Sequence, residues 1–429
     1  MGGKVHFKGL KYAQNATQGP MIRHQVYFDT LGSMQEDSAS WRSVFAGLSV
    51  LRLVDAYNPT GPATAPANWA QLHAVRAAIE EMSEGDAVRG VLTCVVEELS
   101  TRGKMDETVC AALMAYGRTL DYEASWGLAT DVFSTVAAHA RPERHARLAV
   151  EANIAVGGTA RRNGDWETSA RAYSQAAYIA DTLGDHRGVL TVQVGIANTY
   201  LAKGNFPQAQ TILDDVIVQA HDQNLPEIQG HALHTRAVLA SRRGEHAEGL
   251  KLAYEALTLL AKPAEKDGVL EDIAAMFVQL GMHDSARDTH LVLSATAQTK
   301  FVRWSAELNL MELASLDGME EAFDTYARDL ARAPMGAWIR SHYLLFLGEG
   351  FDRFGRQESA IETLKEAAAF AESNQIHQIA FKAQAALERV RSTSRSVPSF
   401  KTAPTWVPDD VATVVRAISE LRKAAVAGT

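Results

Sequence analysis

The stretch RRNGDWETSARAYSQAAYIADTLGD, residues 161–185, is typical of a helix end, a tight glycine turn and a second helix with alanines on one side. Comparable turns follow in KGNF and RGEH, where Gly204 and Gly244 continue from Gly164 at intervals of 40 residues. The series continues, at slightly shorter spacing, at Gly281, near Asp317 and at Gly355. A fixed period of this length indicates an array of helical hairpins.

Small residues recur at two fixed distances from the turn glycines. Seven residues before the turn stand Gly157, Ala197, Ala237, Ala274 and Gly348. Five residues after it stand Ser169, Ala209, Gly249, Ala286 and Ala360. Antiparallel helices approach closely only where side chains are short, so these offsets predict the points where the helices of each hairpin cross.

This pattern resembles the tetratricopeptide repeat, which has small residues on both helices and a glycine, Asp or Asn, aromatic turn, here GDW at Gly164 and GNF at Gly204. The standard unit has about 34 residues. The units here are nearer 40 and resemble the longer repeats of bacterial regulators and kinesin-light-chain adaptors. The resemblance covers roughly residues 150–390. It implies an all-α, right-handed superhelical solenoid of antiparallel helix pairs.

In proteins with this repeat, the first helix of each pair lines the concave face. We place the family's groove positions on this chain by taking each turn glycine as the fifteenth residue of its unit. The resemblance then implies a groove formed by Glu151, Arg161, Arg162, Asn198, His231, His234, Arg242, Glu271, Asp272, Trp304, Glu307, His342, Phe346, Glu349, Asp352 and Arg353.

These groove residues are basic at one end and acidic toward the other, which favours an extended peptide of complementary charge. A solvated face without a specific partner is the alternative interpretation. The family's clamp for the carboxylate end of a chaperone tail is not implied. Asn198 matches one of its positions, whereas Val194, His234 and Thr235 do not.

The pattern divides the chain into five parts: a partly disordered extension over 1–36, helices with degenerate repeats over 37–140, the solenoid over 141–391, a polar linker over 392–408 and a closing helix over 409–429. The closing helix is expected to cap the last hairpin through apolar residues on one face. Near the start, Trp41, Val44, Phe45, Leu48 and Leu51 share a helical face. That helix either caps the solenoid or docks another protein.

Composition narrows the class of partner. The 429 residues carry a net charge of -9, and a protein of pI 5.9 gives no electrostatic reason to bind nucleic acid. Two cysteines are too few for a disulfide framework. The N-terminus lacks the apolar core of a signal peptide, and no segment is long and apolar enough for a membrane span. We therefore expect a cytoplasmic protein without a membrane partner.

The sequence contains no phosphate loop, no H-E-x-x-H motif, no calcium loop and no G-x-S-x-G elbow. Glu227, His231 and His234 are the best candidate metal ligands, but a straight helix rarely turns three side chains over two turns toward one ion. We expect no metal, no cofactor and no catalysis. The favoured hypothesis is a scaffold or adaptor that binds a peptide or partner domain in the groove. The alternative is a regulator that changes shape on binding a small peptide.

Overall fold

The computed structural model describes residues 23–57, 65–140, 142–333, 335–374, 376–392 and 409–427. Within these residues every regular element is an α-helix, and none is both long and apolar enough to cross a bilayer. The helices are α1 (Gln25–Ser33), α2 (Ala39–Ala56), α3 (Ala65–Glu80), α4 (Ala87–Arg102), α5 (Glu107–Tyr122), α6 (Trp126–His139), α7 (Pro142–Arg162), α8 (Trp166–Thr182), α9 (His186–Ala202), α10 (Phe206–Asp222), α11 (Pro226–Arg242), α12 (His246–Leu259), α13 (Pro263–Gln279), α14 (His283–Thr296), α15 (Lys300–Leu316), α16 (Glu320–Ala331), α17 (Ala337–Arg353), α18 (Gln357–Ser373), α19 (His377–Arg391) and α20 (Asp409–Ala427).

Each turn predicted from the sequence joins two antiparallel helices, from the pair α7 and α8 to the pair α17 and α18. The turn glycines have φ between +71° and +84°, a left-handed conformation that a Cβ atom disfavours. At two of these turns the residue after the glycine caps the second helix: Asp165 accepts from the Thr168 amide at 3.0 Å, and Asn205 accepts from the Gln208 amide at 3.3 Å. The glycine therefore ends one helix, and the Asp or Asn begins the next.

The small residues mark the crossing points, as predicted. The Ser169 hydroxyl donates to the Gly157 carbonyl at 2.8 Å, so the two small positions of that hairpin touch. A Cβ atom added to Gly249 would lie 3.1 Å from the Ala237 carbonyl oxygen, the equivalent pair two hairpins later. Short side chains at both offsets therefore set the distance between the helices of a hairpin.

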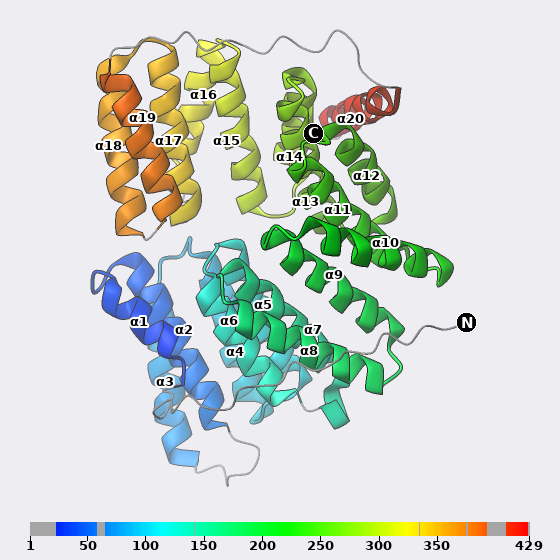
Figure 1. Ribbon diagram of the computed structural model, residues 1–429. Coiled ribbons are helices and arrows are strands. Elements are labelled where there is room, and N and C mark those ends of the chain that lie inside the picture. The colour runs from blue at the N-terminus through cyan, green and yellow to red at the C-terminus, as the bar shows by residue number, and fades with distance from the viewer. Residues whose placement is uncertain are drawn as a thin grey trace.

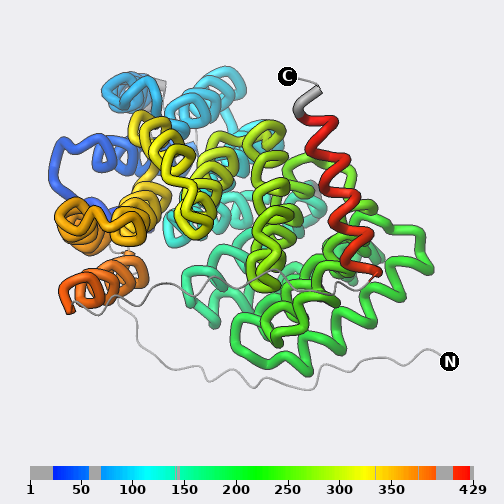
Figure 2. Tube along the Cα trace, turned by 90° about the horizontal axis from the view of Figure 1, so that it is seen from above, coloured from blue at the N-terminus to red at the C-terminus, as the bar shows by residue number. Residues whose placement is uncertain are grey.

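The hairpins form a curved solenoid of two layers. We call α7, α9, α11, α13, α15 and α17 the first helices and their hairpin partners the second helices. First helices pack on one another, for example α7 on α9 and α15 on α17. Figure 1 shows α9 and α11 inside the bend, with α10 and α12 outside it. The bend brings α17, α18 and α19 round to the same side as α1 and α2 (Figures 1 and 2).

The helices before the clear repeats share one core with the first hairpin. Val44, Leu48 and Leu51 of α2 are buried in this core, together with Val156 of α7 and Ala172 of α8. α2 itself packs on α1, α3 and α4, and α5 and α6 are the helices of this part that contact α7. The rest of its apolar face, the pair Trp41 and Phe45, stacks at 5.0 Å between ring centroids and stays partly exposed.

Helix α1 is ordered by contacts with later helices. Tyr27 is fully buried, and its hydroxyl lies 2.9 Å from that of Tyr116 on α5. His24, just before the helix, contacts Asp131 at 2.6 Å and Asp55 at 3.2 Å. Within the extension over residues 1–36, for which partial disorder is predicted, residues 25–33 are helical. Residues 1–22 lie outside the described part of the chain.

The closing helix α20 does not cap the last hairpin, so that prediction was wrong. Its residues Val411, Val414 and Ile418 are buried against α12 and α14. Arg422 pairs with Asp288 of α14 at 2.6 Å. Figure 2 shows α20 in red on the outside of the bend. An amphipathic face specifies burial but not the apolar surface that buries it, and the predicted linker over 392–408 lies almost wholly outside the described residues.

Candidate functional site

The groove residues predicted from the sequence all lie on first helices. We call the side of the first helices that faces the inside of the bend the inner face. Several of these side chains contact the neighbouring first helix and do not point into open space. They fall on the helices as follows: α7 carries Glu151, Arg161 and Arg162; α9 carries Asn198; α11 carries His231, His234 and Arg242; α13 carries Glu271 and Asp272; α15 carries Trp304 and Glu307; α17 carries His342, Phe346, Glu349, Asp352 and Arg353.

At the N-terminal end of the inner face, two of the predicted basic charges have partners within the chain. Arg162 Nη2 lies 2.5 Å from the Asp121 carboxylate on α5. Burial lowers the pKa of Arg161, whose side chain hydrogen-bonds Tyr173 of α8. The basic end is therefore less available to a ligand than the sequence suggests. Arg242 is exposed.

In the middle of the inner face, polar side chains join successive first helices. The Asn198 amide donates to the Thr235 hydroxyl at 3.4 Å, between α9 and α11. His234 Nε2 lies 2.7 Å from the Asp272 carboxylate, between α11 and α13. His234 and Asp272 were predicted separately as groove residues, and the structure makes them partners.

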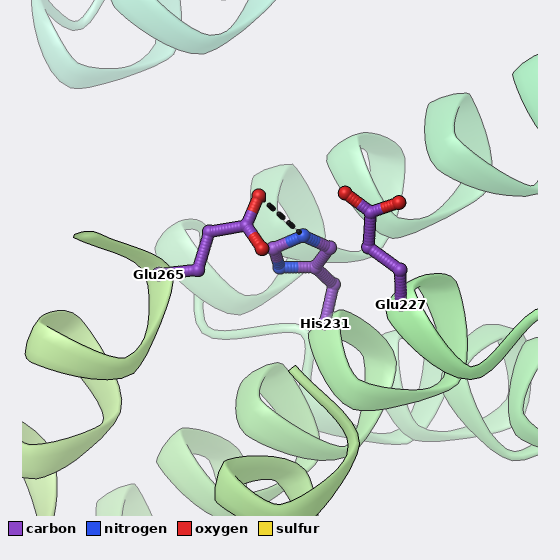
Figure 3. Close-up of side chains that lie close together, drawn as sticks. All are labelled: Glu227, His231 and Glu265. Atoms are coloured by element: carbon purple, nitrogen blue, oxygen red, sulfur yellow. Dashed lines mark ion pairs between the residues drawn. The ribbon is translucent and has the colours of Figure 1, made fainter. Parts of the chain in front are cut away.

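Figure 3 shows Glu227, His231 and Glu265 close together, with a nitrogen or oxygen of each within 4.8 Å of the others. Burial lowers the pKa of His231, which favours the neutral ring that binds metals. Two cations compete for the carboxylates, however. Arg187 of α9 contacts Glu227, while Lys262 lies 2.5 Å from Glu227 and 2.9 Å from Glu265. The group therefore acts as an ion-pair network that links α9, α11 and α13.

The candidate metal ligands predicted from the sequence, Glu227, His231 and His234, all lie on one helix. In the structure the third residue beside Glu227 and His231 is Glu265 from the next hairpin, so His234 was the wrong third residue. Glu265 and Lys262 precede the first position of a 34-residue unit counted from Gly281, so the groove template skips them. The 17-residue first helices α11 and α13 extend the inner face by this extra segment.

Toward the C-terminal end, aromatic side chains dominate. Phe301, Trp338, His342 and Phe346, which we call the aromatic row, have successive ring centroids 5.9, 4.0 and 6.2 Å apart. All four side chains are half-buried, as is Trp304. His342 Nδ1 donates to the Trp338 carbonyl at 2.9 Å, and burial lowers the pKa of His342. The neutral ring continues the aromatic surface.

The predicted acidic groups at this end differ in their partners. Glu349 binds Arg389 of α19 at 2.8 Å and lies 3.7 Å from Arg353. Burial raises the pKa of Glu307, and it raises the pKa of Glu271 to about 7. The carboxylates of α13 and α15 are thus partly desolvated and poorly neutralised, so this stretch of the inner face attracts positive charge.

No protein-family model matches the chain, and no curated protein matches its sequence. The solved structures to which the chain is similar include the following three, each with a TM-score below 0.5. A STAND protein (Signal Transduction ATPase with Numerous Domains) with a tetratricopeptide repeat sensor from Pyrococcus horikoshii has 12% identity and a TM-score of 0.39 over 95% of this chain. The chain spans 61% of the length of that protein.

A Rap protein complexed with competence and sporulation factor has 13% identity and a TM-score of 0.33, with 83% of this chain and 98% of that chain covered. A circular tandem repeat protein with novel repeat topology has 14% identity and a TM-score of 0.18, with 94% and 90% covered. The fold of the present chain is a tetratricopeptide-like, all-α solenoid, as the turns, crossing points and layers described above show.

Proposed function

We propose that this chain is a non-catalytic interaction protein that binds a peptide segment or a partner domain along its inner face. The observation that carries the proposal is the half-buried aromatic row on α15 and α17. Aromatic side chains that are already held by a rigid helix offer large contact areas at little entropic cost, and they are enriched at the centres of protein interfaces. Flanking carboxylates and amides supply hydrogen-bond acceptors and donors.

The same arrangement argues against catalysis. His231 and His234 lie beside Glu265 and Asp272, in contacts that join helices, and they are not aligned on a shared nucleophile. The net charge of -9 disfavours phosphate-rich partners. A protein or peptide is therefore the partner class that we propose, in the cytoplasm, without a nucleic acid, membrane or cofactor.

The test is capture of partners from the native host by the tagged full-length chain after cross-linking, with identification by mass spectrometry. We expect Trp338→Ala to reduce recovery of a specific partner at least tenfold, because a buried aromatic anchor contributes about 2 kcal/mol or more. Tyr178→Ala is the matched control, since Tyr178 lies on second helix α8 and is 69% exposed. Equal recovery by both variants would contradict the proposal.

Circular dichroism confirms that each variant is folded before the comparison is made. His342→Ala provides a second variant of the aromatic row that removes a smaller ring. A triple alanine variant of Arg161, Arg162 and Arg242 is a weaker probe than the sequence suggested. Its Arg162 change also removes the ion pair with Asp121 that joins α7 to α5.

One observation favours the second candidate function, a regulator that changes shape on binding a small peptide. Successive first helices are joined by polar contacts, such as His234 with Asp272, which a ligand can replace with contacts of its own. The expected result is a decrease in the radius of gyration, measured by small-angle X-ray scattering, when a captured peptide is added. A scattering curve that is unchanged at saturation would exclude this function.

A further inference from the structure

A pocket of about 320 Å³ lies where α13, α14 and α15 meet. Its polar lining consists of Glu271 and Gln279 from α13, His290 from α14, and Ser305, Asn309 and Glu312 from α15, with the apolar side chains of Ala275 and Val278 of α13 beside them. Glu271 is one of the predicted groove residues, so the pocket adjoins the inner face. None of the contacts described above uses this space.

The two carboxylates of the pocket are desolvated and lack a cationic partner. Burial raises the pKa of Glu271 and of Glu312 to about 7 in each case. The Ser305 hydroxyl hydrogen-bonds Glu271, but neither glutamate forms an ion pair within the described residues. Keeping two such groups in a pocket is unfavourable unless something compensates their charge.

Other charged groups face these carboxylates without neutralising them. Asp267 and Asp272 on α13 add negative charge around Glu271. On the other side, Arg353 and Lys382 favour the ionised form of Glu312, while Glu349 opposes it. Arg353 itself donates to the Ser315 hydroxyl at 2.8 Å.

His290 gives a second, independent sign of a missing ligand. Its side chain lines the pocket and is only 4% exposed, yet its Nδ1 has no hydrogen-bond partner in the described part of the chain. Burial lowers the pKa of His290 to about 4, so the ring is neutral at physiological pH. An unpaired buried polar atom costs roughly 1–3 kcal/mol, and such atoms are rare in folded proteins unless a ligand or water pairs with them.

We propose that this pocket binds a protonated amine or guanidinium group on a short aliphatic stem, held between the carboxylates of Glu271 and Glu312. An ammonium has three donors and no acceptor, which matches a lining rich in acceptors. Asn309 supplies a further acceptor, because its amide nitrogen already donates to the Ser305 carbonyl at 2.8 Å and its oxygen is left over. The apolar side chains of α13 suit the methylene stem.

The chemistry distinguishes this cation from a metal ion. Among the described residues, the only group of three or more metal-type donors within 4.8 Å of one another is Glu227, His231 and Glu265. The ligand atoms of Glu271, His290 and Glu312 therefore do not all lie within 4.8 Å of one another, and they suit a larger cation that forms separate hydrogen bonds. The source is either a lysine or arginine side chain of a peptide on the inner face, which rests on the proposed function, or a free amine.

Binding is expected to depend on pH. Below about pH 7 the carboxyl groups of Glu271 and Glu312 are increasingly protonated, and a cation must displace those protons to bind. Affinity should therefore rise between pH 6 and pH 8, while His290 stays neutral throughout that range. Each carboxyl group that must ionise weakens binding by up to about tenfold per pH unit below its pKa.

The experiment is isothermal titration calorimetry on the full chain at pH 6 and pH 8. The probes are the peptide Ac-Ala-Lys-Ala-NH2, its norleucine analogue and putrescine. We expect the lysine peptide to bind more tightly at pH 8 and the norleucine peptide not to bind. The double variant Glu271→Gln with Glu312→Gln should lose at least tenfold in affinity. Glu255→Gln, which changes an exposed acid on second helix α12 outside the pocket lining, should remain within about threefold.

Preferential binding of the peptide identifies a basic side chain as the ligand, and preferential binding of putrescine identifies a free amine. The pocket proposal is overturned if the folded wild type binds no cationic probe at pH 8, or if the double variant binds as well as wild type. These results are separable from the partner capture. Loss of capture in Trp338→Ala with no amine binding refutes the pocket alone, whereas amine binding without any captured partner refutes the interaction function alone.

Discussion

Replacing Gly195 with alanine tests whether close packing against a tyrosine ring has a larger effect on stability at this position than helix propensity has. Gly195 lies inside α9, and a Cβ atom added there would be 2.3 Å from Cε1 of Tyr173 on α8. The ring cannot simply move away, because a Cβ atom at Gly157 of α7 would already lie 2.8 Å from it. Its hydroxyl is also held by Arg161. Tyr173 is thus wedged between two glycines.

The expected change in the free energy of unfolding has the opposite sign to the change that helix propensity predicts. In a helix interior alanine is favoured over glycine by about 1 kcal/mol. Overpacking a well-filled site costs about 1–3 kcal/mol, and displacing Tyr173 adds the loss of its hydrogen bond. We therefore expect a net destabilisation of about 1–2 kcal/mol. Gly90→Ala is the matched control, because Gly90 is inside α4 with no atom within 4 Å, and it should stabilise by up to about 1 kcal/mol.

Urea unfolding followed by far-UV circular dichroism measures both changes, and hydrogen exchange of the α7, α8 and α9 amides locates them. Because neighbouring hairpins of a solenoid unfold partly independently, the exchange data identify the hairpin affected. In a Tyr173→Leu background the Gly195→Ala penalty should shrink by more than half, since the two sites share one contact. A Gly195→Ala protein as stable as wild type would refute the wedge.

Three further predictions concern other parts of the molecule. Burial opposes the charged form of His24, but the hydrogen bond and charge of Asp131, together with Asp55, outweigh it and raise the pKa of His24. The stabilisation that His24 provides is therefore complete below its ordinary pKa of 6.5 and is lost as pH rises through its pKa in the folded protein. At pH 8 the amides of α1 should then exchange faster than the intrinsic change in exchange rate explains. The substitution His24→Asn should remove that excess, because Asn tolerates the left-handed φ of 62° at this position. Ile418→Ala should lower the free energy of opening of α20, measured by exchange of its amides, by about 2–5 kcal/mol, because Ile418 is fully buried. Leu421→Ala, at a 40% exposed site on the same helix, should change that free energy by less than about 0.5 kcal/mol. Similar effects of the two substitutions would contradict the observed packing. Added Zn²⁺ should leave the Tm unchanged, because Arg187 and Lys262 already pair with the Glu227 and Glu265 carboxylates. A rise in Tm of several degrees that Glu265→Gln abolishes would show instead that Glu227, His231 and Glu265 bind the metal.

The features that the sequence predicted well depend on short stretches of chain. A turn glycine with positive φ and a small residue seven positions before it are set within one hairpin, as the contact between Gly157 and Ser169 shows. The placement of α20 could not be predicted in this way. Val411, Val414 and Ile418 predict burial, but any exposed apolar surface of the array could receive them.

The inner-face contacts that the sequence analysis missed follow a rule that depends on the repeat length. Arg162 and Asp121 are separated by 41 residues, Arg187 and Glu227 by 40, and Glu349 and Arg389 by 40. In a solenoid, equivalent positions of neighbouring units lie side by side, so a partner one repeat away in sequence is a neighbour in space.

A search for opposite charges separated by one repeat length would therefore have found these pairs before the structure did. The same search would have left Glu271 without a cation, because its one-repeat contact is with Ser305, a neutral residue. Where a repeat array pairs most of its inner charges in this way, the positions that stay unmatched are the ones at which an external ligand gains most by binding. In this chain that reasoning leads to Glu271 of α13, which lines the pocket together with Glu312.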